Sequence, residues 1–426
     1  MPAETGFAAT AEKNVAPILT IGSLFFIFGF VTWLNGPLIT FVKLAFELDD
    51  VNAFLVPMAF YLSYFFLALP ASAILRATGM KRGMALGFVV MAAGAAAFGH
   101  FTTQRWYPGA LTGLFVIGAG LSLLQTAANP YISILGPIEG AARRIAFMGI
   151  CNKFAGFLAP FVFGAIALRG LDGFAAQVQA AATPQAREAL LKAFAGQVYW
   201  PYMTMAALLL AMAAFILASR LPDLRPADVN AAEVSATDGA GILAYPHLWC
   251  GVVALFLYVG VEVMAGDAIG IYGEGFGLPP AATRFFTSWT LFAMLAGYIL
   301  GVVLTPRYVA QARYLALSAA LGMALALAAW LTTGRVSIAC IAAMGFANAM
   351  MWPAIFPLAI AGLGRHTETG SALLIMAIAG GALMPWWFAL LKQHVPFQLA
   401  YLALALPAYA FIFWYGAAGF ALRRRS

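Results

Sequence analysis

Two carboxylates and one lysine interrupt long apolar stretches of this sequence. Glu262 and Asp267 lie in YVGVEVMAGDAIG (258–270), and Lys153 follows Asn152 in another apolar stretch. An ionisable side chain costs a few kcal/mol in hydrocarbon, so it normally faces protein or water and marks a pathway. A buried carboxylate can also bind and release a proton as its surroundings change. These three residues are our candidates for ion coupling, and structural pairing is the alternative.

The spacing of the two carboxylates separates them on a helix. Residues five positions apart point about 140° away from each other, so Glu262 and Asp267 cannot easily share one face. We expect one to face a cavity and the other to lie at a helix interface or near the outer rim. Lys153 lies at a depth that is marginal for its side chain to reach the membrane surface; if it does not reach it, it needs a buried anion as its partner.

Amide side chains form a second group of candidates. Gly118, Ser122, Gln125 and Asn129 occupy positions i, i+4, i+7 and i+11, which is one face of a helix. Amides provide both hydrogen-bond donors and acceptors, so this face could bind a polyhydroxylated solute. A seam of small and polar residues between two helices is the alternative.

The stretch VTWLNGP (31–37) combines an aromatic ring, an amide and a weak helix. The Gly-Pro pair frees backbone groups, and interrupted helices of this kind often line binding sites. The tryptophan offers an apolar face to a sugar ring, with simple packing as the alternative. Together with polar residues of other stretches, the predicted substrate-binding residues are Asn35, Trp33, Ser122, Gln125, Asn129, Asn152, Asn348 and Trp352.

Other chemistry is not indicated. The sequence contains no metal-ligand cluster, nucleophile elbow, Walker loop or dinucleotide fingerprint. The three cysteines fall in apolar stretches, where they act as small hydrophobic residues. We therefore predict no enzyme activity, no metal and no cofactor apart from a co-transported proton or sodium ion.

The composition identifies the environment of these residues. Charged residues make up 9% of the chain and apolar residues 63%, whereas a soluble domain is about a quarter charged. Uncharged runs of roughly 20 residues, the length of a bilayer-spanning helix, recur along the chain. The short alternating strands of a membrane barrel do not occur. We therefore predict an all-α membrane protein.

We predict twelve transmembrane helices, and the first one is retained because the polar stretch 1–16 has no cleavage signal. With both termini cytoplasmic, fourteen Lys and Arg residues lie inside and eight outside, which obeys the positive-inside rule. The predicted spans are 17–44, 52–75, 83–101, 109–135, 145–168, 200–219, 247–272, 285–305, 314–333, 337–362, 371–391 and 398–422.

A long polar linker, 220–245, divides the chain into two parts, 1–219 and 246–426. GFLAP (156–160) and GALMP (381–385) occupy corresponding spans of the two parts. These features favour two six-helix repeats, the major facilitator architecture. A second polar connection contains TPQAREALLKAF, which predicts an amphipathic surface helix starting at Thr183-Pro184.

Several segments carry a family resemblance: FFIFGFVTWLNGPLITFVKLAFELDD, AFYLSYFFLALPASAILRATGMKRG and GAGLSLLQTAANPYISILGP in the first part, and YVGVEV, PAIFPLAIAGLG and GGALMP in the second. They resemble the fucose permease and glucose/galactose permease branch of the major facilitator superfamily. The resemblance implies import of a sugar by alternating access in a bacterial inner membrane. Coupling in this family is usually to protons and in some members to sodium.

Two departures from the family concern coupling. Fucose permeases carry Asp at the position of Gly36 and Glu at the position of Gln125, and both positions are neutral here. Aligning the two repeats through Gly29 and Gly260 sets Gly36 opposite Asp267, so a carboxylate of the second repeat could replace the missing one. If the protein is coupled, we expect Asp267 or Glu262 to carry the cation, with Lys153 as a partner.

The predicted function is uptake of a small neutral sugar, because the amides of the first repeat carry no fixed charge. The resemblance leaves glucose, galactose and N-acetylglucosamine open, and we expect a functional monomer with no nucleic-acid partner. A sugar uniporter, a drug or metabolite exporter of the same architecture, and a sugar-sensing membrane receptor are the alternatives.

Overall fold

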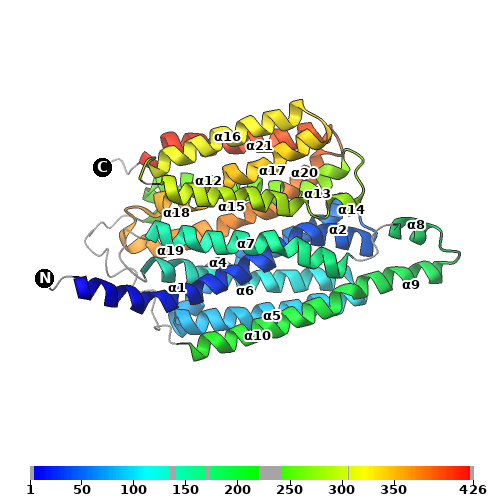
Figure 1. Cartoon of the computed structure of the whole chain (residues 1–426), viewed down its shortest axis with the longest axis horizontal. Coiled ribbons are helices and arrows are strands. Elements are labelled where there is room, and N and C mark those ends of the chain that lie inside the picture. Colours follow the sequence, from blue (N-terminus) through cyan, green and yellow to red (C-terminus); the bar gives the residue numbers. More distant parts are fainter. Residues whose placement is uncertain (1–3, 135–140, 169–172, 220–240, 306, 423–426) are drawn as a thin grey trace.

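The computed structural model describes residues 4–134, 141–168, 173–219, 241–305 and 307–422. Helices make up most of these residues, and no strand occurs among them. The long helices lie side by side in one bundle, and both ends of the chain lie at the same end of it (Figure 1). We call this the termini end. The opposite end, where α9 (Pro184–Ala195) projects, is called the α9 end.

Twelve helical segments in the described residues are long and apolar enough to cross a bilayer, and each overlaps one predicted span. The prediction of an all-α membrane protein with twelve spans is therefore confirmed. The helices before the linker are α1 (Glu4–Trp33), α2 (Asn35–Ala45), α3 (Asp50–Ala53), α4 (Leu55–Thr78), α5 (Met80–Thr103), α6 (Tyr107–Ile134), α7 (Ala141–Ala167), α8 (Phe174–Gln179), α9 and α10 (Tyr199–Ala218).

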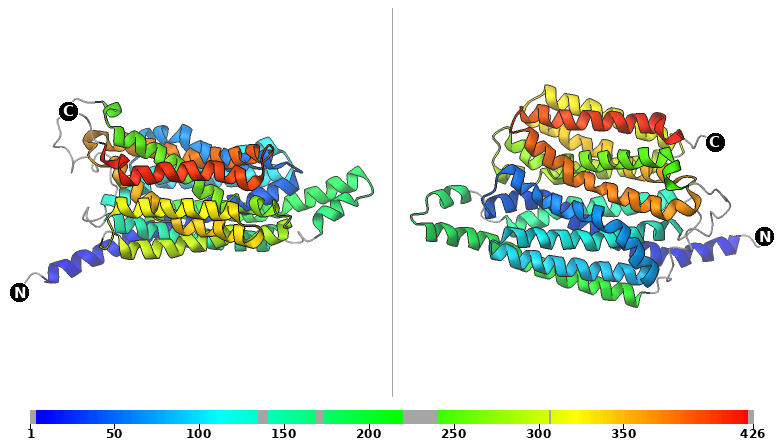
Figure 2. Two further views of the ribbon diagram at one scale, coloured as in Figure 1. Left: turned by 90° about the horizontal axis from the view of Figure 1, so that it is seen from above. Right: turned by 180° about the vertical axis from the view of Figure 1, so that it is seen from behind.

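The helices after the linker are α12 (Pro246–Gly266), α13 (Ile269–Glu274), α14 (Pro280–Thr283), α15 (Phe286–Leu304), α16 (Gln311–Leu331), α17 (Gly334–Asn348), α18 (Met351–Ile360), α19 (Thr367–Met376), α20 (Gly380–Leu391) and α21 (Phe397–Ala417). We call the helices up to α10 the first half and those from α12 onward the second half. The two halves form opposite sides of the bundle (Figure 2). Most of the predicted linker, 220–240, lies outside the described residues, so the division into two domains stays a prediction.

Several spans consist of two helices separated by a short break. The first span breaks at Leu34, between α1 and α2, next to the Asn-Gly-Pro sequence that predicted a weak helix. The seventh span breaks at 267–268, between α12 and α13. There the hydroxyls of Thr287 and Thr290 in α15 donate to the carbonyls of Gly266 and Ala265, each at 2.8 Å. Side chains of a neighbouring helix thus satisfy backbone groups that the break would leave bare in hydrocarbon.

Ion pairs join the two halves at the α9 end. Lys43 of α2 lies 2.6 Å from Asp50 of α3 and 2.6 Å from Glu274 of α13. Lys392, which follows α20, also pairs with Asp50. These four residues, the α9-end ion network, are 17–25% exposed, so they are partly shielded from water. The network links α2 and α3 of the first half to the second half.

The termini end carries a weaker link between the halves. Arg76 at the end of α4 lies 2.7 Å from Glu368 at the start of α19, and the Arg76 side chain is 58% exposed. Exposed ion pairs of this kind contribute roughly 0–1 kcal/mol. Among the described residues, the ion pairs between the halves are therefore more numerous and better shielded at the α9 end.

The predicted surface helix is present as α9. Its N-cap is Thr183, whose side-chain oxygen accepts a hydrogen bond from the backbone N–H of Ala186 at 3.1 Å, and Pro184 occupies the first turn. Glu188 of α9 pairs with Arg105, and Arg187 pairs with Glu47. Both partners belong to the first half.

Glycines allow helices to approach closely within each half. A Cβ atom added at Gly29 would collide with the backbone oxygen of Asn152, so α1 and α7 touch through their backbones. In the second half, a Cβ atom at Gly380 would collide with the backbone oxygen of Phe256 in α12. Such contacts bring van der Waals attraction and tight packing, which drive helix association in lipid.

We predict that Gly29→Ala destabilises the protein. The added methyl group has no space, and overpacking of this kind costs roughly 1–3 kcal/mol. The matched control is Gly196→Ala, because Gly196 has a φ of −65° and no atom lies within 4 Å of its added Cβ. Thermal unfolding in detergent should show a clear fall for Gly29→Ala only. Equal melting of the two variants would contradict the close contact.

Candidate binding cavity

A cavity of about 110 Å³ lies between the two halves. In the first half it is lined by residues of α1, α4, α6 and α7, and in the second half mainly by residues of α12, α15 and α18. Ligand pockets usually measure roughly 300–1,000 Å³. The helices around the cavity must therefore move apart to admit a ligand of the size of a sugar.

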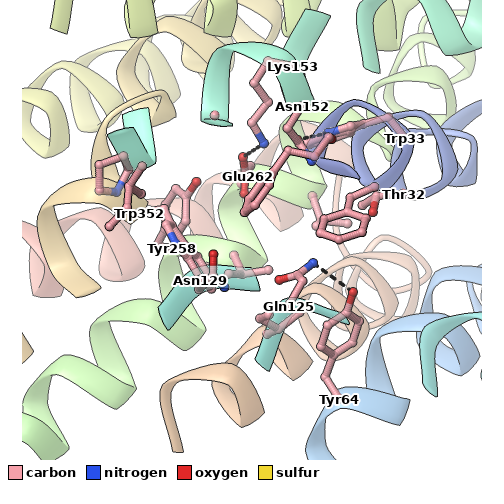
Figure 3. Close-up of a pocket in the computed structure, with 18 of the residues that line it drawn as sticks. Thr32, Trp33, Tyr64, Gln125, Asn129, Asn152, Lys153, Tyr258, Glu262 and Trp352 are labelled. Carbon is pink, nitrogen blue, oxygen red and sulfur yellow. Dashed lines mark hydrogen bonds and ion pairs between the residues drawn. The ribbon is translucent and has the colours of Figure 1, made fainter. Parts of the chain in front are cut away.

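Most of the predicted site residues lie in the cavity wall. Figure 3 shows them pointing toward one another from both halves. Because they come from five different spans, only the packing of the bundle brings them together. The predicted residues that line the cavity are Trp33, Gln125, Asn129, Asn152, Trp352, Lys153 and Glu262.

The remaining predicted residues are buried beside the cavity and do not line it. Asn35 is 2% exposed, Ser122 and Asn348 are fully buried, and Asp267 is 2% exposed. The side-chain oxygen of Asn348 accepts a hydrogen bond from the hydroxyl of Tyr409 at 2.9 Å. In this conformation these four residues lie between helices, and their predicted roles stay predictions.

The central polar contact of the cavity is an ion pair between the halves. Nζ of Lys153 lies 2.6 Å from Oε1 of Glu262, and each side chain is 9% exposed (Figure 3). Nζ also lies 4.5 Å from the centre of the Trp33 ring, in position for a cation–π contact. Lys153 thus has the buried anion that the sequence allowed as an alternative to reaching the membrane surface.

Hydrogen bonds hold the amides of the cavity in place. Nε2 of Gln125 donates to the hydroxyl of Tyr64 at 3.1 Å. Nε1 of Trp33 donates to Oδ1 of Asn152 at 3.4 Å, and Nδ2 of Asn152 donates to the carbonyl of Phe25 at 3.4 Å. The amide groups and the tryptophan ring therefore form part of one connected wall.

Aromatic residues of the wall were not predicted from the sequence. Tyr61 and Tyr64 of α4, Tyr258 of α12 and Tyr298 of α15 all line the cavity. A tyrosine in an apolar helix usually packs in the core, so its position in the sequence does not separate the two roles. The hydroxyl group of each tyrosine was the one signal for a place in the cavity wall, because a buried hydroxyl needs a polar partner.

The two carboxylates face different surroundings, in line with their expected separation on the helix. Glu262 lines the cavity, and Asp267 lies at the break after α12 and faces α2. A Cβ atom added at Gly36 would lie 3.2 Å from Oδ1 of Asp267. The carboxyl group of the second half thus lies directly against the glycine that the repeat alignment set opposite it.

The cavity combines hydrogen-bonding and apolar surfaces without a net charge on its wall. Lys153 and Glu262 neutralise each other, and the other predicted residues in the wall are amides and indoles. Within the described part of the chain, no group of three or more His, Cys, Asp or Glu residues is placed to hold a metal ion. The arrangement suits a neutral ligand with both hydroxyl groups and apolar faces.

Comparisons with known proteins agree with this architecture. The chain is 34% identical to the glucose/galactose transporter of Brucella abortus over 416 residues, which is 96% of each protein. It is 29% identical to the L-fucose-proton symporter of Escherichia coli over 381 residues, 88% of this chain and 87% of the relative. The solved structure of the transporter FucP in its outward conformation aligns with a TM-score of 0.74 and 26% identity, covering 95% of this chain and 99% of FucP.

These relatives are transporters and not enzymes, which agrees with the catalytic motifs being absent from the sequence. The family model described as Major Facilitator Superfamily matches residues 21–385. That match covers most of the chain and includes residues of all the helices that line the cavity. The twelve-span protein therefore belongs to the Major Facilitator Superfamily.

Proposed function

We propose that this protein is a secondary transporter that imports a neutral sugar by alternating access. The candidate substrates are a hexose or an N-acetylhexosamine: glucose, galactose or N-acetylglucosamine. The observation that carries the proposal is the cavity between the halves, with its amides, its aromatic rings and its internally neutralised ion pair. The names of the relatives, a glucose/galactose transporter and a fucose-proton symporter, support it.

The chemistry of the wall favours a sugar over a charged solute. A sugar ring presents hydroxyl edges, which amides such as Gln125 and Asn129 can bind, and apolar faces, which Trp33 or Trp352 can cover. An organic acid would need a cation in the wall, but Lys153 is already paired with Glu262. A cationic drug would need an unpaired anion in the wall, but Glu262 is already paired with Lys153. Polar residues also fit a sugar better than the apolar substrates of many exporters.

The links between the halves support alternating access. The α9-end ion network holds the halves together at one end, whereas an exposed ion pair joins them at the other. In this arrangement we propose that the cavity exchanges its ligand with the termini end. The distribution of Lys and Arg supports a cytoplasmic location for that end. The protein would then lie in a bacterial inner membrane with both termini inside.

The charges near the cavity favour coupling to a cation. Glu262 and Asp267 carry two negative charges when ionised, and Lys153 supplies one positive charge. The remaining negative charge would be costly inside a membrane protein unless a cation accompanies it. A proton on a carboxyl group or a bound sodium ion would satisfy this requirement. We therefore propose that the sugar enters together with one of these cations.

Uptake into proteoliposomes tests the function. We expect labelled glucose or N-acetylglucosamine to accumulate above its external concentration when a pH or sodium gradient is imposed, because the cation gradient supplies the free energy. Sugar that equilibrates without accumulating under either gradient would instead indicate a uniporter. If neither sugar is taken up and an apolar compound is extruded, the exporter alternative holds.

Gln125 tests the assignment of the cavity. We predict that Gln125→Ala weakens sugar binding by roughly tenfold, the effect of losing about one hydrogen bond of 1–1.5 kcal/mol. The matched control is Gln104→Ala, because Gln104 is exposed and lies outside the cavity wall. Titration calorimetry in detergent measures both. Unchanged affinity in Gln125→Ala would reduce this residue to a packing role.

The two carboxylates are expected to give different transport defects. We predict that Asp267→Asn abolishes accumulation and retains exchange of labelled for unlabelled sugar, because exchange needs no net movement of the cation. Glu262→Gln should impair both processes, because it leaves Lys153 without its partner in the cavity wall. Paired uptake and exchange assays separate the two patterns. Normal accumulation in both variants would show that neither carboxylate carries the cation.

A further inference from the structure

The break in the seventh span places Asp267 at the boundary between the halves. The residue lies between α12 and α13 and is 2% exposed. The hydroxyls of Thr287 and Thr290 cap the carbonyls just before it, which stabilises the break from the side of α15. The carboxyl group therefore has a fixed position, and it faces the first half of the protein.

Asp267 belongs to a layer of close contacts between the halves. Its Oδ1 would lie 3.2 Å from a Cβ atom at Gly36. A Cβ atom at Gly266 would collide with Trp33, and one at Gly381 would lie 3.2 Å from Cγ of Tyr61. We call these contacts the glycine layer. Because the glycines have no side chains, backbone and side chains of opposite halves meet without a gap at these points.

The glycine layer separates the cavity from the α9 end. Along the first span, Trp33 lines the cavity, Gly36 lies in the layer and Lys43 belongs to the α9-end ion network. Gly36 and Lys43 are seven positions apart in the chain, which corresponds to about 10 Å along a helix. Two successive zones of contact thus close the α9 side of the cavity, and Asp267 lies in the inner one.

The surroundings of Asp267 disfavour a negative charge in this closed state. The donors that face its carboxyl group are the backbone N–H of Gly36 and the hydroxyl of Tyr61. From the described residues, neither oxygen receives a hydrogen bond of good geometry. The charged side chains acting on it are Glu262 of α12 and Lys153 of α7, and these two form their own pair. An ionised carboxylate without close partners is far more costly to bury than a protonated one.

We propose that Asp267 is a proton site, separate from the sugar cavity, and that the α9 end closes over it only when it is protonated. This inference rests on the proposed alternating access and deepens its coupling step. When the α9 end opens, water reaches Asp267 from that side. A proton from that water forms an O–H bond with a carboxylate oxygen, and the neutral group can then be enclosed by the glycine layer.

Release to the other side is possible through Tyr61. This tyrosine lines the cavity and its hydroxyl also faces Asp267, so it connects the enclosed site to water in the cavity. The O–H bond on Asp267 breaks there and the proton passes to that water, with no change of oxidation state. A sodium ion fits the site less well, because the N–H of Gly36 cannot coordinate a cation and the hydroxyl of Tyr61 adds only one oxygen to those of the carboxyl group.

The experiment measures closure of the α9 end without any sugar. Spin labels are attached at Asn52→Cys in α3 and Gln393→Cys after α20, two exposed positions on opposite halves. The native cysteines are replaced by serine, and the full chain is placed in lipid nanodiscs. Double electron–electron resonance between pH 5 and pH 9 then measures the distance between the two labels. The distribution of distances gives the ratio of closed to open protein. The native cysteines are Cys151, Cys250 and Cys340.

The sign of the expected pH dependence follows from proton linkage. If closure binds one proton, the ratio of closed to open protein rises as the pH falls, by at most about tenfold per pH unit. In Asp267→Asn the neutral amide takes the place of the protonated acid, so the ratio of closed to open protein should no longer change with pH over the whole range. Asp267→Ala tests the same point with a smaller neutral group, so that a folding defect in one variant leaves the other to decide.

A control variant and two contradicting outcomes complete the experiment. Glu188→Gln makes the same change in an exposed carboxylate of α9 and should keep the parent's pH response. A parent pH response that persists in the neutral Asp267 variants would overturn the proposal. Closure driven by sodium at constant pH, and lost in those variants, would also overturn it by assigning the site to sodium. This measurement uses no sugar, so its result does not depend on the outcome of the uptake assays.

Discussion

The structure depends on the cost of placing polar groups in hydrocarbon. Lipid offers no hydrogen bonds, so every polar side chain within the spans must find protein or water. In this chain the amides of the cavity wall, the Lys153–Glu262 pair and Asp267 lie between the halves, and many large apolar side chains are exposed. The same requirement explains the threonine hydroxyls that cap the break after α12. The lipid around the bundle therefore restricts these polar groups to the boundary between the two halves.

That boundary contains two kinds of ion chemistry with different consequences. Lys153 and Glu262 form an ion pair, with Nζ 2.6 Å from Oε1, and so leave the cavity wall without a net charge. Removing one partner of a buried pair leaves an uncompensated charge and costs roughly 3–5 kcal/mol, so Lys153 and Glu262 depend on each other in this conformation. Asp267 has no such partner and lies outside the cavity wall. We propose that these two carboxylates of the seventh span serve two purposes: Glu262 shapes the proposed sugar site, and Asp267 makes the contact between the halves sensitive to charge.

The sequence predicted the parts of the structure that have a local or periodic signal. Hydrophobic runs located the twelve spans, the Thr183-Pro184 pair located the start of α9, and Asn35-Gly36-Pro37 located the interruption of the first span. The one-face spacing groups Gln125 and Asn129, which both line the cavity, with Ser122, which is buried between helices. The pairing of Lys153 with Glu262 joins residues 109 positions apart, and only the packing of the halves specifies it. The tyrosines of the wall could not be separated from core residues, since both occupy the same positions on apolar helices.

The attachment of α9 has a mechanical consequence. Its ion pairs join it to Glu47 and Arg105, which both belong to the first half, and it projects beyond the end of the bundle (Figure 1). Its twelve residues extend about 18 Å. A helix fixed in this way behaves as a rigid lever on one half, so a small rotation of that half about the membrane centre becomes a larger sweep at the tip. An antibody fragment or a fluorophore bound to α9 would therefore register a tilt of the first half that is hard to see from within the membrane.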